Sequence, residues 1–123
     1  MFDTLFKRKP AAYETVEARQ ILGWHGSKDV VFVDVRGADE IARSGTIKHA
    51  IRAPLPGFAN FARPDGSGSL PSVDSGKSVV VVCASGMRSA SACSALADMG
   101  YEKVYNVAGG FGAWAAAGGP VER

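Results

Sequence analysis

The sequence predicts an α/β fold in which helices cover both faces of a parallel β-sheet. Strand-like and helix-like segments alternate along the chain, which is the pattern of parallel strands joined by crossover helices. The most apolar segment, Ser78 to Val82, contains four consecutive valines and suits a central strand that is buried on both faces. The 123 residues provide one hydrophobic core, and a second domain would not fit.

The N-terminal part is expected to place one helix before the first strand. Residues 1–12 are expected to form a tail, and residues 13–123 the folded domain. Val16 to Leu22 has apolar residues at helical spacing, and Thr15 before it is a candidate N-cap. Val30 to Val35 consists mostly of β-branched residues and predicts a buried strand.

A short helix, a short strand and a long loop are expected next. Gly37 to Ser44 fits a helix that Gly45 would end. Ile51 to Ala53 predicts a brief strand, because the proline that follows cannot continue the hydrogen-bond ladder. From Asn60 to Lys77 the composition shifts to Pro, Gly, Ser and Asp, which predicts a solvated surface loop.

Two helices and one strand are expected after the central strand. Met87 to Met99 is rich in Ala and Ser and fits a helix that Gly100 would close. Val104 to Val107 predicts the last strand, and Phe111 to Ala117 predicts the last helix, with glycines on both sides. Ligands of parallel sheets bind at the carboxyl ends of the strands, so functional residues are expected there.

Composition and charge argue against several classes of function. The formal net charge of +2 is too small for the clustered basic face of a nucleic-acid-binding protein. No apolar run approaches the roughly 20 residues that span a bilayer. The basic residues Lys7 to Lys9 follow the apolar residues of the first segment, which is the reverse of a secretory signal. We therefore expect a cytoplasmic protein that binds neither nucleic acid nor a membrane.

Cys83 is the candidate catalytic nucleophile. It directly follows the most apolar strand, and a helix begins near Arg88, with four residues between the two. A loop that turns from a strand into a helix points backbone N–H groups inward, and the helix N-terminus adds partial positive charge. Both effects would stabilise a thiolate or a persulfide and lower the pKa of Cys83 below the usual value of about 8.5. Gly86 would let the backbone approach an anion closely.

The same residues also have a structural interpretation. Cys83 would then be a buried cysteine at a strand end, and Arg88 a residue on the helix surface. The second cysteine, Cys93, could resolve a persulfide, but it shares one face of the predicted helix with Ala90 and Ala97. We interpret Cys93 as a small buried side chain.

The residues around Cys83 resemble a known family. Cys83-Ala-Ser-Gly-Met-Arg88, followed by Ser89, resembles the active-site loop C-x-x-G-x-R of the rhodanese-like sulfurtransferases. Val33-Asp-Val-Arg36 resembles the strand of this family that ends in D-x-R, and Glu40 lies in a segment similar to the one that follows it. The Gly-Gly-x-x-x-Trp sequence that ends at Trp114 resembles the closing helix of the family. The resemblance extends from about Tyr13 to Val121.

This resemblance implies a fold and an activity. The fold would be a five-stranded parallel sheet flanked by helices on both faces. The activity would move sulfane sulfur from a donor such as thiosulfate to a thiophilic acceptor such as cyanide or a thiol, with Cys83 as the persulfide carrier. The resemblance assigns the substrate-binding loop to Ala84, Ser85, Gly86, Met87 and Arg88, and a supporting role to Asp34, Arg36 and Ser89.

The implied partners are a small sulfur-containing anion, or the thiol or persulfide of a partner protein. Two departures from the family pattern concern the donor. Thr46-Ile-Lys-His49 stands where the family often has His-Ile-Pro-Gly, and Ala84 stands where some thiosulfate-preferring members carry a basic residue. Two alternatives therefore remain beside the enzyme acting on thiosulfate: a protein-to-protein persulfide relay, and a non-catalytic interaction module. Retention of the complete loop argues against the module.

Other candidates are weaker. A phosphatase or arsenate-reductase loop, C-x5-R, would need an arginine at the position of Ser89. Neither His25 nor His49 has companions at metal-ligand spacing, so no metal or other cofactor is expected, and whether His49 reaches the site stays open. Trp114 is expected in the core. The remaining basic candidates are expected to be solvated: Arg43, Lys48, Arg52 and Arg63.

Overall fold

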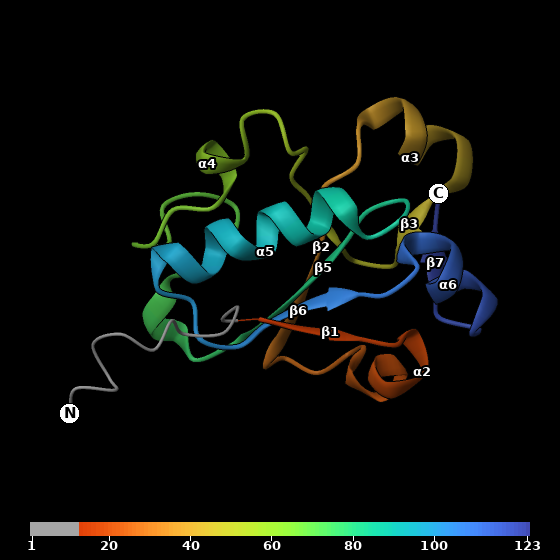
Figure 1. Ribbon diagram of the computed structural model, residues 1–123, viewed down its shortest axis with the longest axis horizontal. Coiled ribbons are helices and arrows are strands. Elements are labelled where there is room, and N and C mark those ends of the chain that lie inside the picture. Colours follow the sequence, from red (N-terminus) through yellow and green to blue (C-terminus); the bar gives the residue numbers. More distant parts are fainter. Residues whose placement is uncertain (1–12) are drawn as a thin grey trace, which may run out of the picture.

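A five-stranded parallel sheet forms the centre of the molecule. The computed structural model describes residues 13–123, with the sheet order β1-β6-β5-β2-β4 (Figure 1). The strands are β1 (Glu14–Val16), β2 (Val30–Asp34), β4 (Ile51–Arg52), β5 (Ser78–Val82) and β6 (Val104–Val107). A separate antiparallel pair joins β3 (Thr46–Ile47) to β7 (Val121–Glu122).

Five α-helices and two short 3₁₀ helices connect the described strands. They are α2 (Ala18–Ile21), α3 (Ala38–Ser44), α4 (Phe58–Phe61), α5 (Met87–Met99) and α6 (Gly110–Ala116), with η1 (Leu22–Trp24) and η2 (Val73–Ser75). Figure 1 shows α4 and α5 on one side of the strands and α2 on the other. Among residues 13–123, no helix is long and apolar enough to cross a membrane.

The hydrophobic core lies on both faces of the sheet. Alternate residues of a strand point to opposite faces, and β5 shows this clearly. Val79, Val81 and Cys83 belong to the core cluster that includes residues of α4 and α5. Val80 and Val82 belong to the cluster that includes residues of α2 and α6. The run of valines is explained by burial on both faces, and the predicted α/β fold class is confirmed.

Several predicted elements are found with the predicted bounds. The prediction is confirmed to the residue for β5, for α5 and for β6. Helix α3 has Gly37 at its N-cap and Gly45 at its C-cap, where φ is +84°. Its placement matters for function, because α3 follows strand β2 and lies near the carboxyl end of the sheet.

The prediction for Val16 to Leu22 is partly wrong. Thr15 lies within strand β1, which pairs in parallel with β6, and the helix is only Ala18–Ile21, with Glu17 as its N-cap. Three residues are too few to show the two-residue period of a strand, so the pairing with β6 could not be recognised from the local pattern.

The long loop is less solvated than its composition suggests. Leu70 is buried in the core, and the Tyr101 hydroxyl donates a hydrogen bond to the Pro71 carbonyl oxygen. Before the loop, Phe58 is buried and anchors α4. The predicted tail, residues 1–12, lies outside the described residues.

Candidate active site

Cys83 lies at the carboxyl end of the central strand, in the turn between β5 and α5. Helix α6 fixes the backbone of Cys83, because the Phe111 N–H donates to the Cys83 carbonyl oxygen at 2.8 Å. Gly110, with φ +67°, packs directly against the carbonyl groups of Cys83 and Ala84. The last helix therefore holds the start of the loop in place.

The Cys83 thiol contacts polar groups of its own loop and of the helix that follows. The Gly86 N–H donates to Sγ at 3.0 Å, and the Ser89 Oγ lies 3.2 Å from Sγ. Gly86 has φ +107°, a conformation that side-chain-bearing residues avoid, and this turn is what directs its N–H back at the sulfur. Cys83 itself is fully buried, so its sulfur forms the floor of the loop.

These neighbours favour the ionised form of Cys83. Burial of the thiol raises its pKa, because a charged sulfur is poorly solvated there. Hydrogen bonds from the Ser89 side chain and from the backbone of Ser89, Gly86 and Ser85 lower the pKa by more. The net pKa of Cys83 is therefore lower than that of an ordinary cysteine, which is the property of a reactive thiol.

The rest of the loop forms an exposed rim around this sulfur. Ala84 and Ser85 are exposed, and Met87 is 78% exposed, which is unusual for a large apolar side chain. Arg88 supplies the single charge between Cys83 and Ser89. The loop thus presents backbone N–H groups, small side chains and one thioether rather than a set of cations.

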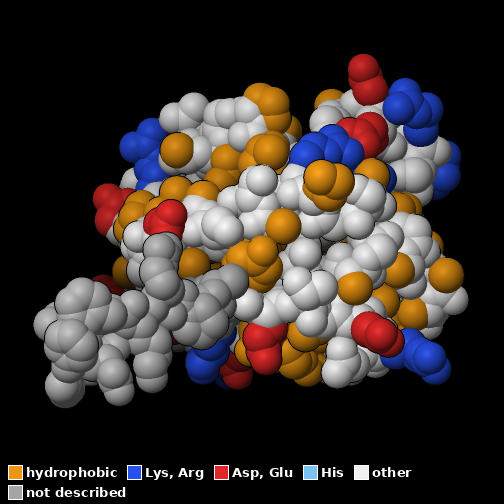
Figure 2. Space-filling model, viewed as in Figure 1, with side chains coloured by type: hydrophobic (Ala, Val, Ile, Leu, Met, Phe, Trp, Pro, Cys, Tyr) orange, Lys and Arg blue, Asp and Glu red, His pale blue; other side chains and the backbone are white. Residues whose placement is uncertain are grey.

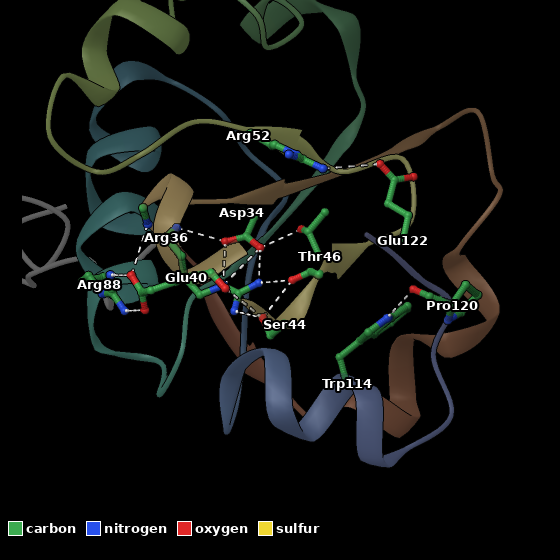
Figure 3. Close-up of polar contacts among 12 residues, drawn as sticks. Asp34, Arg36, Glu40, Ser44, Thr46, Arg52, Arg88, Trp114, Pro120 and Glu122 are labelled. Atoms are coloured by element: carbon green, nitrogen blue, oxygen red, sulfur yellow. Dashed lines mark hydrogen bonds and ion pairs between the residues drawn. The ribbon is translucent and has the colours of Figure 1, made fainter. Parts of the chain in front are cut away.

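The charge of Arg88 is paired with Glu40, a residue that the sequence did not assign to the site. Arg88 Nη1 and Nη2 donate to Glu40 Oε1 and Oε2 at 2.6 and 2.8 Å, a two-pronged ion pair between α5 and α3 (Figure 3). Hydrogen bonding from Arg88, with the backbone of Gly37, lowers the pKa of Glu40 to about 2. Figure 2 shows acidic and basic side chains intermixed on this face of the molecule, without a broad basic patch.

Asp34 and Arg36 lie beside the loop but do not bind it directly. Their side chains form a buried ion pair at 2.8 Å, and Asp34 also accepts a hydrogen bond from Thr46 Oγ1 at 2.7 Å (Figure 3). Arg36 donates to the Gly45 carbonyl oxygen at 2.7 Å, and its guanidinium lies over the Phe111 ring. Their hydrogen bonds join β2 to the end of α3 and to β3. Arg36 also contacts Phe111, whose N–H donates to the Cys83 carbonyl oxygen.

Ser89 connects Cys83 to a second residue that the sequence did not assign to the site. Ser89 is fully buried, and its hydroxyl lies 2.5 Å from Asn106 Oδ1, which is a second acceptor for its single hydrogen. Asn106 is a buried residue of β6, the strand beside β5. A polar residue within the otherwise apolar segment Val104–Val107 was the available signal, because buried amides need hydrogen-bond partners.

The structure separates the other candidates from the loop. Cys93 is buried on α5, and burial, with the neighbouring Cys83, raises its pKa to about 12, so it is a structural thiol as predicted. His49 precedes β4 at the amino-terminal side of the sheet, where its ring stacks on His25. Trp114 is fully buried, as expected. Among the described residues, no group of three or more His, Cys, Asp or Glu side chains is arranged to hold a metal ion.

Comparison with known proteins agrees with this geometry. The family model of the rhodanese-like domain matches residues 17–117 of this chain. The chain belongs to this family. Among its rhodanese-like relatives, a sulfurtransferase of Allochromatium vinosum is 37% identical over 95 residues, which cover 77% of this chain and 80% of the relative. Thiosulfate sulfurtransferase GlpE of Pseudoalteromonas translucida is 31% identical over 111 residues, covering 86% of this chain and 92% of the relative.

Solved structures give the same fold. A rhodanese-like domain protein of Staphylococcus aureus matches with a TM-score of 0.68 and 29% identity, over 89% of this chain and 99% of that one. A Rhodopseudomonas palustris protein of unknown function, described as a possible tyrosine phosphatase, matches with a TM-score of 0.77 and 34% identity, over 90% and 86% of the two chains. The five-stranded parallel sheet with flanking helices is thus the rhodanese-like fold, as the sequence resemblance implied.

Proposed function

We propose that this rhodanese-like protein is a sulfurtransferase that carries sulfane sulfur as a persulfide on Cys83. The observation that carries the proposal is the position of Sγ at the floor of the loop, where the Gly86 N–H and the Ser89 hydroxyl lie within 3.2 Å of it. These groups favour an ionised sulfur nucleophile and require no separate general base. Thiosulfate is the donor to test, because several relatives are named thiosulfate sulfurtransferases.

The reaction has two balanced steps. In the first, the Cys83 thiolate attacks the outer sulfur of thiosulfate, so that an Sγ–S bond forms, the S–S bond of thiosulfate breaks, and sulfite leaves with the electron pair. In the second, cyanide or an acceptor thiolate attacks the outer sulfur of the persulfide. The Sγ–S bond then breaks, the acceptor keeps the sulfur atom, and Cys83 returns as a thiolate. The loop stabilises negative charge in both states through its backbone N–H groups.

The loop length supports sulfur rather than phosphate as the transferred group. Four residues separate Cys83 from Arg88, and the next residue, Ser89, is buried with its hydroxyl directed at Asn106. A phosphate bound at a cysteine loop needs more donors around its three oxygens than a single sulfur atom does. The ion pair with Glu40 also occupies Arg88, which would otherwise be the natural phosphate ligand.

The test is the mass of the intact protein after incubation with thiosulfate. The expected result is a gain of one sulfur atom that cyanide removes, in the wild type and in Cys93→Ala, and no gain in Cys83→Ser. Cys93→Ala is the matched control, because it removes the other thiol and leaves the loop intact. Full thiosulfate:cyanide activity in Cys83→Ser would refute the mechanism.

A second candidate is a relay that receives or delivers sulfur through a partner protein's thiol. Two observations favour it: Arg88 has its charge paired with Glu40, and Met87 is 78% exposed beside Cys83. A small dianion gains little from such a rim, whereas a partner protein can cover the thioether. Persulfide formation from a protein persulfide donor, with none from thiosulfate, would identify the relay.

A further inference from the structure

The Asn106 side chain has a fixed orientation beside the Cys83 loop. Asn106 is 5% exposed, and its Nδ2 lies 3.4 Å from the Gly86 carbonyl oxygen and 3.5 Å from Thr15 Oγ1. A carbonyl oxygen only accepts hydrogen bonds, so the Nδ2 end of the amide must face Gly86. The Oδ1 end then faces Ser89, and because Oδ1 also only accepts, the Ser89 hydroxyl must donate to it.

The Ser89 hydroxyl has one hydrogen and two possible acceptors. Asn106 Oδ1 lies 2.5 Å from Ser89 Oγ, and Cys83 Sγ lies 3.2 Å from the same oxygen. While the hydrogen is given to Asn106, the contact with Cys83 is satisfied only when a thiol donates its own hydrogen to Ser89 Oγ. A Cys83 thiolate has no hydrogen to give, so it can use Ser89 only by taking the hydrogen away from Asn106.

We propose that Asn106 is a positioning residue that competes with Cys83 for the single hydrogen of the Ser89 hydroxyl. This inference rests on the proposed function, in which Cys83 alternates between thiolate and persulfide. The Asn106–Ser89 bond favours the thiol over the thiolate. The Asn106–Ser89 hydrogen bond does not disfavour the persulfide in the same way. In that state the negative charge is on the outer sulfur, so Sγ does not require a hydrogen bond from Ser89. Asn106 thereby disfavours the free thiolate relative to the sulfur-loaded state.

The titratable groups near Cys83 form no hydrogen bond with the Asn106 amide among the described residues. Arg88, on the same loop, couples electrostatically to Cys83 and is paired with Glu40, and the Cys93 thiol couples to Cys83 from α5. Neither contacts the Asn106 amide through the hydrogen bonds of the described residues. Removing the amide therefore changes the hydrogen bonding of Ser89 without removing a charge.

A purely structural role for Asn106 predicts the opposite change in the pKa of Cys83 when the amide is removed. Asn106 Nδ2 lies against the Gly86 carbonyl, and the Gly86 N–H donates to Cys83 Sγ. If the amide served only to hold this turn, its loss would loosen Gly86 and weaken the hydrogen bond to the thiolate. The pKa of Cys83 would then rise, whereas competition for the Ser89 hydrogen predicts that it falls.

The experiment measures the rate of Cys83 alkylation by iodoacetamide as a function of pH, in full-length protein carrying Cys93→Ala. Asn106→Leu replaces the amide with an apolar side chain that has the same number of heavy atoms, and Ser89→Ala removes the shared hydroxyl. At a pH below the pKa of Cys83, we expect Asn106→Leu to react about fivefold faster, the equilibrium factor of one neutral hydrogen bond. Ser89→Ala is expected to react more slowly, because the thiolate loses a donor.

The double variant tests whether Asn106 changes the alkylation rate of Cys83 through the Ser89 hydroxyl. In the Ser89→Ala background, Asn106→Leu is expected to change the alkylation rate by less than about twofold, since the hydroxyl for which the two groups compete is gone. A slower reaction of Asn106→Leu, or an equal acceleration with and without Ser89, would overturn the proposal. Asn106→Ala provides the same comparison if the leucine variant does not fold.

Alkylation does not depend on sulfur transfer, so the two proposals fail separately. If thiosulfate loads Cys83 but Asn106→Leu leaves the pH profile unchanged, the inference about Asn106 is wrong and the proposed function stands. If the profile shifts as expected but no donor loads Cys83, the proposed function is wrong, and the competition for the Ser89 hydrogen stands.

Discussion

Gly110→Ala is expected to damage both the stability of the protein and the Cys83 loop. Gly110 is buried, has φ +67° and begins α6. A Cβ at this position would lie within 3.0 Å of the carbonyl oxygens of Cys83 and Ala84, which is closer than real Cβ atoms come. Backbone atoms cannot move aside as a flexible side chain can, so the loop and the helix must separate.

The size of the effect follows from two costs. A residue with a Cβ in the left-handed region costs about 1–2 kcal/mol. Forcing an additional carbon into a packed contact costs about 1–3 kcal/mol more. We therefore expect Gly110→Ala to lower the free energy of unfolding by about 2–5 kcal/mol. Separation of the two segments would also break the hydrogen bond from the Phe111 N–H to the Cys83 carbonyl oxygen, which is 2.8 Å long.

Gly112→Ala is the matched control within the same helix. Within residues 13–123, no atom beyond the chain neighbours and the backbone of the helix itself lies within 4 Å of a Cβ at Gly112, so alanine is expected to stabilise α6 by up to about 1 kcal/mol through its helix propensity. Urea unfolding followed by circular dichroism gives both free energies, and the mass gain with thiosulfate reports on the loop. If Gly110→Ala were as stable as Gly112→Ala and loaded sulfur equally well, the packing argument would be refuted.

Three further predictions concern the charged groups and the second thiol. The ion pair with Arg88 lowers the pKa of Glu40 from 4.5 to about 2, so the stabilisation from this pair is complete above about pH 4.5 and is lost as the pH falls towards 2. Glu40→Gln should therefore remove this part of the pH dependence of the free energy of urea unfolding. At neutral pH it should lower that free energy by about 1 kcal/mol. Arg36→Met leaves the Asp34 carboxylate buried without its charged partner and should lower the free energy of urea unfolding by about 3–5 kcal/mol. The control, Arg52→Met, breaks an exposed ion pair with Glu122 and should lower it by less than about 1 kcal/mol. Cys93, whose pKa is raised to about 12 by burial, should react with iodoacetamide much more slowly than Cys83, whose pKa is lowered, and equal rates for the two thiols would contradict this difference in pKa.

The local patterns of the chain determined the elements that depend on neighbouring residues. The run of valines in β5 predicts a buried strand without knowledge of the helices that cover it. The glycines that follow α3 and α5 end those helices through their own backbone conformations. The loop after β5 is equally local. Its length, its glycine and its helix start are set by consecutive residues, so Cys83 and its neighbours could be assigned from the sequence.

The assignment of Thr15 failed for the complementary reason. Strand β1 has three residues and lies at the edge of the sheet, where it is held by its pairing with β6 about ninety residues later. A segment this short has no periodic pattern of its own. Its conformation is set by a partner that is distant in the sequence, and the adjacent apolar residues were therefore interpreted as part of a helix.

The sequence by itself determined the α/β class, the central strand and the loop that presents Cys83. Only the tertiary structure decided what surrounds that loop. Glu40 reaches Arg88 from a helix 48 residues away, and Asn106 reaches Ser89 from a strand 17 residues further along the chain. The physical reason is that both contacts depend on the register and stacking of separate elements in the sheet. Side-chain hydrogen bonds of this kind leave no period or spacing in the sequence, although one pairs the charge of Arg88 and the other holds the Ser89 hydroxyl beside Cys83.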